Sequence, residues 1–287
     1  MQSFRDHLRS LEALATRLRI DVLEMTHRAG FGNTGSALSV MDILVALYFG
    51  QLHDRPLMAL DPQKPGFEGQ DYFVLSKAQG CPAWYAVLAE KGFFERGEME
   101  YFAQLGGLLQ SHPTKKIPGV AISSGAIGNG FSAALGLALA LKMDKQLNRV
   151  FCLLGDGELQ EGQIWEGALC AAHHKLDNLI AIVDWNDLQL DGLTRGVMNV
   201  DPIADKFEAF GWKTIPVRNG HDFEELLYAF ERAFEISRRP VAIIARTVKG
   251  KGVSFAENKV SYNCALSEQE MAAAVAKLQG ELKLLEI

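Results

Sequence analysis

Two short apolar segments, separated by one helical pattern, constrain the fold of this chain more than any other feature. Residues 149–154 and 179–183 are rich in Val, Ile, Leu and Phe, as strands buried inside a sheet are. Between them, apolar side chains recur at helical spacing from Ile164 to Leu176. This order of segments predicts a β-α-β unit whose two parallel strands lie side by side.

Polar residues follow each of these two strands. Asp156 stands in a Gly-Asp-Gly sequence after the first, and Asn186 follows the second, 30 residues later. Parallel neighbours lie about 4.8 Å apart, so oxygens at adjacent strand ends can converge on one ion. The crevice at these ends is where open α/β sheets bind ligands. The Asp156 carboxylate, the Asn186 amide oxygen and the Leu188 carbonyl form an oxygen set suited to Mg²⁺.

The same Gly-Asp-Gly sequence has a simpler interpretation. Such sequences often form plain turns between a strand and a helix. The asparagine at the next strand end favours the ligand site instead. The glycines on either side of Asp156 would also let an anion approach the backbone amides closely.

Composition excludes several classes of protein. The 287 residues are 48% apolar and 22% charged, with a net charge of −6 and no basic cluster, so neither nucleic-acid binding nor a membrane role is expected. The first ten residues lack the apolar core of a signal peptide, and the most apolar stretch, 131–141, is about half as long as a membrane span. The four cysteines form no C-x-x-C pair. Reduced, mostly buried thiols in a cytoplasmic protein are therefore expected.

The rest of the chain alternates between helical and strand patterns. Further strands are predicted at 71–75, 212–217 and 241–245, loops at 29–36, 61–69 and 193–196, and helices at 6–28, 38–49, 82–91, 131–143, 203–210, 222–237 and from 267. The fold class is therefore α/β, a three-layer α/β/α arrangement around a mainly parallel sheet. We expect one domain, 1–287, with a carboxyl-terminal arm and helix from about 248.

The central motif and its surroundings resemble a known family. Residues 155–192 read GDGELQEGQIWEGALCAAHHKLDNLIAIVDWNDLQLDG, which is similar to the amino-terminal, diphosphate-binding domain of transketolase. The resemblance covers nearly the whole chain and implies thiamine diphosphate and Mg²⁺ as cofactors. It assigns the metal to Asp156, Asn186 and the Leu188 carbonyl, and a diphosphate contact to the Gly157 amide. Glu158, in the same motif, is expected in the cofactor-binding set.

Other positions follow from the resemblance. Gly125, Ala126 and Ile127 stand where the family usually has Gly-Pro-Leu against the cofactor ring. Glu161 matches the acid that links paired active sites across the subunit interface. An equal alternative is a first-turn glutamate favoured by the helix dipole. His112 corresponds to the histidine that recognises the C1 hydroxyl of the donor substrate.

Three family histidines are replaced by amides in this chain. They are Asn33 in the first glycine-rich loop, Gln79 before the third predicted helix, and Asn263 in the arm. We expect Gln79 and Asn263 to contact cofactor, and Asn33 with His112 to contact substrate. An amide can hydrogen-bond a phosphate or hydroxyl oxygen but cannot exchange a proton near neutral pH. The remaining histidines His173, His174 and His221 are expected to be surface or structural residues.

The resemblance implies that this chain needs a partner. A full transketolase also has a pyrimidine-binding domain, which supplies the glutamate that activates the cofactor, and a carboxyl-terminal domain. We therefore expect a split, two-component enzyme, in which this chain and a carboxyl-terminal partner subunit form an α2β2 heterotetramer. Three functions remain open: transfer of a two-carbon ketol or acyl unit, a decarboxylating 2-oxo-acid ligase or acyl transferase, and a non-catalytic cofactor-binding scaffold.

Overall fold

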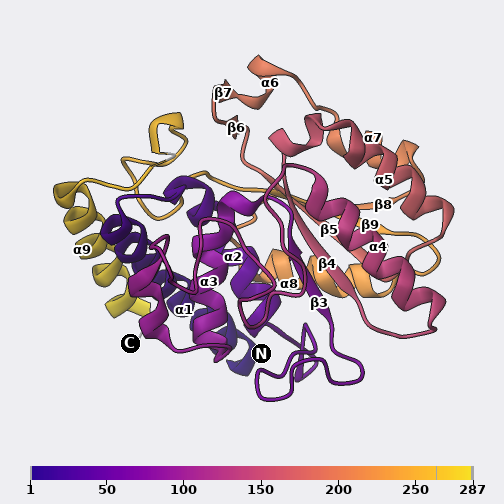
Figure 1. The fold of residues 1–287 in the computed structure, drawn as a ribbon, viewed down its shortest axis with the longest axis horizontal. Helices are drawn as coiled ribbons and strands as arrows, with labels where there is room; N and C mark the ends of the chain where they lie inside the picture. The colour runs from indigo at the N-terminus through magenta and orange to yellow at the C-terminus, as the bar shows by residue number, and fades with distance from the viewer. Residues whose placement is uncertain (1, 263, 286–287) are drawn as a thin grey trace.

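A five-stranded parallel sheet forms the centre of the molecule in a computed structural model, which describes residues 2–262 and 264–285 (Figure 1). The strand order is β3-β4-β5-β9-β8, and all neighbours pair in parallel. The strands are β3 (Tyr72–Leu75), β4 (Val150–Gly155), β5 (Leu179–Trp185), β8 (Lys213–Val217) and β9 (Val241–Arg246). The predicted adjacency of the strands on either side of Gly-Asp-Gly is confirmed, since β4 pairs directly with β5.

Helices cover both faces of this sheet. The helices of the described residues are α1 (Gln2–Ala29), α2 (Thr34–Phe49), α3 (Cys81–Lys91), α4 (Asn129–Met143), α5 (Gly162–His173), α6 (Thr194–Val197), α7 (Ile203–Ala209), α8 (Phe223–Phe234) and α9 (Glu268–Leu285). Of these, α9 packs on α1 and α6 follows β7, so neither covers the sheet. Two small antiparallel pairs, β1 (Gln51–Leu52) with β2 (Arg55–Pro56) and β6 (Leu188–Gln189) with β7 (Gly192–Leu193), lie outside the sheet. Short 3₁₀ turns include Ala78–Gly80 and Gly157–Gln160.

The burial of alternate strand residues explains the three layers. On β4, Phe151 and Leu153 pack with α1, α2, α3 and α8 in one core, whereas Cys152 and Leu154 pack with α4, α5 and α7 in a second core. Every residue of β4 is buried, which is why its sequence is continuously apolar rather than alternating. The predicted three-layer α/β/α fold is confirmed, with α4, α5 and α7 together on one side of the sheet in Figure 1.

Most predicted elements form within a few residues of their expected bounds, and one prediction is wrong. The sequence pattern predicts a loop at 193–196, but Thr194–Val197 is a short helix, preceded by a strand residue, Leu193. The Thr194 amide and hydroxyl bond to Asp187 and Asp156, respectively. Contacts that are distant in sequence therefore set this local structure, and no local pattern reveals them.

The helix predicted at 222–237 begins at Phe223, because Asp222 is the N-cap of α8 and accepts hydrogen bonds from the amides of Glu224 and Glu225. All four cysteines are free, but only Cys81 and Cys152 are buried, so the expectation of mostly buried thiols holds for half of them. Within the described part of the chain, no helix is long and apolar enough to cross a bilayer.

Candidate functional site

The register of the two central strands brings the predicted polar residues together. Gly155, the last residue of β4, lies opposite Asp184 of β5. Asp156 follows β4 directly and Asn186 follows β5 directly, so both lie just beyond the carboxyl ends of adjacent strands. A bond from the Asp156 amide to the Asp184 carbonyl, at 3.2 Å, joins the two strand ends. The sequence therefore predicted this juxtaposition correctly.

Asp156 is a buried carboxylate held by neutral donors. It is 2% exposed. Its Oδ1 accepts from the Gly157 amide at 2.9 Å, and its Oδ2 accepts from the Asp187 amide at 2.7 Å and the Thr194 hydroxyl at 3.2 Å. Burial, with the nearby Asp184 charge, raises the pKa of Asp156 to about 6. A cation beside this carboxylate would offset both effects.

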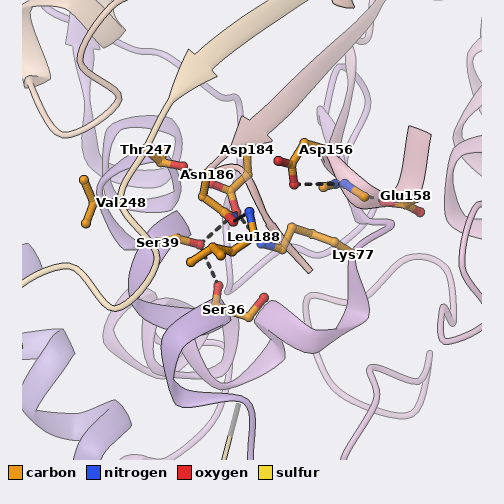
Figure 2. Close-up of polar contacts among 12 residues, drawn as sticks. Ser36, Ser39, Lys77, Asp156, Glu158, Asp184, Asn186, Leu188, Thr247 and Val248 are labelled. Atoms are coloured by element: carbon orange, nitrogen blue, oxygen red, sulfur yellow. Dashed lines mark hydrogen bonds and ion pairs between the residues drawn. The ribbon is translucent and has the colours of Figure 1, made fainter. Parts of the chain in front are cut away.

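Asn186 is oriented by its two neighbours. Its Nδ2 donates to Asp184 Oδ2 at 2.9 Å, and its Oδ1 accepts from the Leu188 amide at 3.0 Å. Asp184, which is 0% exposed, is the central acceptor of this cluster. Figure 2 shows Asp184 between Asn186 and Lys77, next to Asp156. Asp184 thus fixes which way the Asn186 amide points, and its oxygen faces the segment that carries Leu188.

Most predicted site residues line one cavity of ≈ 290 Å³. Those lining it are Asn33, Gln79, Ile127, Asp156, Gly157, Glu158, Glu161, Asn186 and Leu188. These residues come from five separate segments of sequence, which the parallel sheet gathers at one edge. Two of the three predicted site amides, Asn33 and Gln79, are therefore at the cavity, whereas Asn263 lies outside the described residues.

His112, Gly125 and Ala126 lie outside the lining of this cavity. His112 is exposed and packs against Gly125, where a Cβ would be 3.4 Å from the ring. Ile127, the next residue in that segment, does line the cavity and is 45% exposed. An apolar side chain with this exposure beside polar groups is available to contact a ligand.

The two acidic residues of the motif after Asp156 differ in their surroundings. Glu158 is buried, and its carboxylate accepts from the Ser76 hydroxyl at 2.5 Å, the Gly128 amide at 2.8 Å and the Gly155 amide at 3.1 Å. It therefore ties three loops together around the cavity. Glu161 is exposed at the N-cap position of α5, and its side chain makes no capping bond.

Two lysines of the site were not identified from the sequence. Lys77 is buried beside Asp184 and forms an ion pair with it. Lys249 is 4% exposed, lines the cavity, and has no hydrogen-bond or ion-pair partner among the described residues. Burial, and then the positive charge of Lys77, lowers the pKa of Lys249 to about 8. The position of Lys249 just after the last apolar strand was the available signal, because that strand ends at the same edge as β4 and β5.

The donor set fits a hard cation and a bound anion together. Among residues 2–262 and 264–285, no group of three or more His, Cys, Asp or Glu side chains could hold a metal ion. A site here would instead combine one carboxylate, one amide oxygen, a backbone carbonyl and oxygens from a ligand, as Mg²⁺ sites with phosphate ligands do. The ammonium of Lys249, which lines the cavity, is the matching feature for the anionic part of such a ligand.

A parallel α/β sheet with a polar cavity at its strand ends defines a class of proteins that bind a ligand at this edge. Residues 10–283 match the family described as transketolase, thiamine diphosphate binding domain. The chain belongs to the transketolase family and contains its thiamine diphosphate binding domain.

Relatives divide into short chains and full-length enzymes. The chain is 41% identical to the 6-deoxy-6-sulfo-D-fructose transketolase subunit SqwG of Clostridium sp. (strain MSTE9), covering 94% of this chain and 97% of that one. It is 35% identical to an apulose-4-phosphate transketolase subunit of Phocaeicola vulgatus, covering 96% of each. Human transketolase is 38% identical over 97% of this chain but only 44% of its own length. The structure of transketolase from Campylobacter jejuni superimposes with a TM-score of 0.82 at 27% identity, over 96% of this chain and 48% of that one.

Proposed function

We propose that this chain binds thiamine diphosphate with Mg²⁺ and, together with a partner subunit, transfers a two-carbon ketol or acyl unit between small molecules. One observation supports this function above the others. The carboxylate of Asp156, the amide of Asn186 and the unpaired ammonium of Lys249 all line one cavity at the ends of the parallel strands, among the residues that the structure describes. This combination of groups accommodates a divalent cation and a diphosphate side by side.

Each residue has a defined part in this proposal. Asp156, Asn186 and the Leu188 carbonyl would hold Mg²⁺, and Lys249 would neutralise diphosphate charge. Gly157 would donate its amide once that amide is released from Asp156 Oδ1. Ile127 offers an apolar surface for the cofactor ring. The cofactor, when bound, supplies the carbanion-stabilising chemistry.

We also propose that residues 1–287 form one diphosphate-binding domain that works as the amino-terminal subunit of a two-component, cytoplasmic enzyme. Two relatives matched over 97% and 96% of their own length carry the word subunit in their names. The partner would be a carboxyl-terminal subunit with a pyrimidine-binding domain, in an α2β2 assembly. Glu161, which is exposed at the start of α5, would then serve the contact between paired sites.

Calorimetry tests the cofactor assignment directly. Thiamine diphosphate is titrated into the reconstituted pair of subunits in Mg²⁺, and again with Mg²⁺ removed by a chelator. Saturable binding that needs Mg²⁺ is expected. Absence of binding in both conditions would remove both enzymatic functions, whereas binding without turnover of any ketose or 2-oxo acid would favour a non-catalytic scaffold.

A second function is favoured by the amides at the cavity. Asn33 and Gln79 line it, and the family resemblance implies that they replace histidines, which could exchange a proton. A 2-oxo acid donor needs no deprotonation of a C3 hydroxyl, because carbon dioxide leaves instead. The alternative is therefore a decarboxylating 2-oxo-acid ligase or acyl transferase.

Two measurements separate these functions. Carbon dioxide release from hydroxypyruvate or pyruvate, without cleavage of any ketose, would support the decarboxylating enzyme. Introducing histidines at both positions, with Asn33→His and Gln79→His, should increase ketose cleavage if the amides are what limit it. Unchanged ketose cleavage in this double variant, with cofactor binding intact, would contradict the proposed effect of the amides.

A further inference from the structure

A buried network beside the backbone of residues 248–251 links elements that are far apart in sequence. The side chains of Arg19 in α1, Asp42 in α2 and His221 after β8 are only 5–6% exposed. His221 Nδ1 lies 2.6 Å from Asp42 Oδ2, and Arg19 Nη2 donates to the same oxygen. Burial opposes ionisation of Asp42, but Arg19 and His221 outweigh it and lower the pKa of Asp42 to about 2. Asp42 is therefore an ionised acceptor that Arg19 and His221 share.

The network reaches the backbone on both sides of Lys249. The Val248 amide donates to His221 Nε2 at 2.8 Å, and Arg19 Nε donates to the Lys251 carbonyl at 3.2 Å. Lys249 itself lies between these two anchor points, with its side chain at the cavity. The segment 248–251 is thus held by two side chains that share one carboxylate.

The hydrogen bonds determine the tautomer of His221. A backbone amide can only donate, so Nε2 of His221 must be the acceptor of the Val248 bond. Nδ1 therefore carries the proton and donates it to Asp42. Asp42 fixes both the tautomer and the ring orientation that the Val248 contact requires.

The turn that carries His221 packs directly on the segment before Lys249. The Gly220 amide donates to the Arg246 carbonyl at 2.6 Å. A Cβ at Gly220 would lie 2.7 Å from Thr247 Cγ2 and 2.9 Å from the Arg246 carbonyl, so only glycine permits this approach. Thr247 in turn donates to Asp184, the central acceptor seen in Figure 2.

We propose that His221, oriented by Asp42, is a positioning residue that holds Lys249 at the cavity where an anion binds. This inference rests on the proposed function, in which the anion is the diphosphate of the cofactor. Lys249 is 4% exposed as a residue and has no partner in the described part of the chain. It needs a fixed backbone to keep its ammonium at the cavity, because its stem can otherwise carry the charge toward solvent. The Asp42–His221–Val248 chain supplies that constraint.

Two substitutions test the contacts of the two His221 ring nitrogens one at a time. His221→Asn places an amide near the Nδ1 position, so it keeps a partner for Asp42 but cannot reach Val248. His221→Gln places its amide oxygen near the Nε2 position and keeps the Val248 contact. In the reconstituted pair, His221→Asn should weaken thiamine diphosphate binding in Mg²⁺ by about tenfold, with turnover at saturating cofactor changed by less than about twofold. His221→Gln should restore affinity to within about threefold of wild type.

Control variants exclude a general loss of stability. His53→Asn alters a histidine whose side chain is 83% exposed, and it should leave cofactor affinity unchanged. In a Lys249→Met background, His221→Asn should cause no further loss of affinity, because the group that it positions is gone. An equal loss in both backgrounds would overturn the proposal, since His221 would then act without Lys249.

Amine labelling tests the positioning without any cofactor. The full chain is treated with acetic anhydride at pH 8, and the modification of each lysine is followed by mass spectrometry. Lys249 should label several-fold faster in His221→Asn than in wild type, and near the wild-type rate in His221→Gln. An unchanged rate in His221→Asn overturns the inference. If labelling changes as expected but the wild-type pair binds no thiamine diphosphate, the proposed function fails and the positioning of Lys249 stands.

Discussion

Two sets of buried charges lie at the carboxyl ends of the strands, and the protein neutralises them to different degrees. Asp184 is fully buried and accepts hydrogen bonds from Ser39, Lys77, Asn186 and Thr247. Asp156 and Lys249 are also buried, but they face the cavity. Within the described residues, Asp156 has only neutral donors and Lys249 has no partner.

The pKa values follow this difference. Burial alone would raise the pKa of Asp184, but Lys77 and the hydroxyl donors outweigh it and the pKa is lowered. At Asp156 burial dominates and raises the pKa to about 6, and at Lys249 burial lowers the pKa to about 8. The protein completes the first set of interactions itself and leaves the second set to be completed by a cation and an anion. The Asp184 cluster is therefore scaffold, and Asp156 and Lys249 are the binding groups.

The largest expected effect is on the scaffold. Asp184→Ala leaves the ammonium of Lys77 buried without a counter-charge, so the free energy of unfolding should fall by about 3–5 kcal/mol. Urea denaturation of the full chain measures this loss. Asp144→Ala, at an exposed position after α4, should change stability by less than about 0.5 kcal/mol.

The double variant Asp184→Ala with Lys77→Met makes this test decisive. Removing both charges leaves no stranded ammonium, so much of the lost stability should return. If Lys77→Met gave no recovery, the ion pair would not be the reason for the loss, and the contrast with Asp156 would weaken.

The second effect is on metal and cofactor binding. Asp156→Asn removes the only carboxylate of the proposed metal site, so the affinity for Mg²⁺ with thiamine diphosphate should fall on the order of 100-fold. The free energy of unfolding should change much less than in Asp184→Ala. Among the described residues, Asp156 has no charged partner that would be left buried and unpaired. Asp191→Asn is the matched control, since Asp191 is an exposed acid lining the same cavity. An equal loss of affinity in that control would mean that net charge, not coordination, matters.

The sequence was sufficient to predict Asp156 and Asn186 as site residues, but it was not sufficient to predict Lys249. Asp156 and Asn186 could be predicted because consecutive apolar strands of a β-α-β unit are neighbours, so a local pattern fixes where their ends meet. Lys249 follows β9, and nothing local indicates that β9 rather than β8 pairs with β5. That order depends on packing across the whole sheet.

Interaction partners were the least predictable part of the site. The roles of Asp184 and Lys77 depend on contacts between residues 107 positions apart. The short helix at Thr194 depends on bonds to Asp187 and Asp156. Residue type and spacing reveal none of these contacts. The three-layer fold, in contrast, follows from the sequence pattern, because strands that are apolar on both faces need helices on both sides of the sheet.

A smaller effect is expected from the titration of Lys249. The ammonium loses its proton as the pH rises through about 8, so an anion binds less tightly above that pH. Thiamine diphosphate affinity in Mg²⁺ should therefore fall about tenfold between pH 7 and pH 9. Lys249→Met should be weaker at pH 7 and nearly independent of pH over this range. A wild-type affinity that stays constant to pH 9 would contradict the role of Lys249 as the anion-binding charge.

The last expected effect, of similar size, is the one that most directly separates the two lysines. The pKa of Lys249 is lower in the folded than in the unfolded protein, so the folded state binds fewer protons and stability rises as pH rises from about 8 toward 10.5. At pH 7 the buried charge is therefore unfavourable, and Lys249→Met should stabilise the free chain by about 1–2 kcal/mol. Lys77→Met should instead destabilise the chain, because it leaves the Asp184 carboxylate buried without a counter-charge. Urea denaturation at pH 7 compares the two variants, and destabilisation by both would mean that Lys249 also has its charge balanced within the protein.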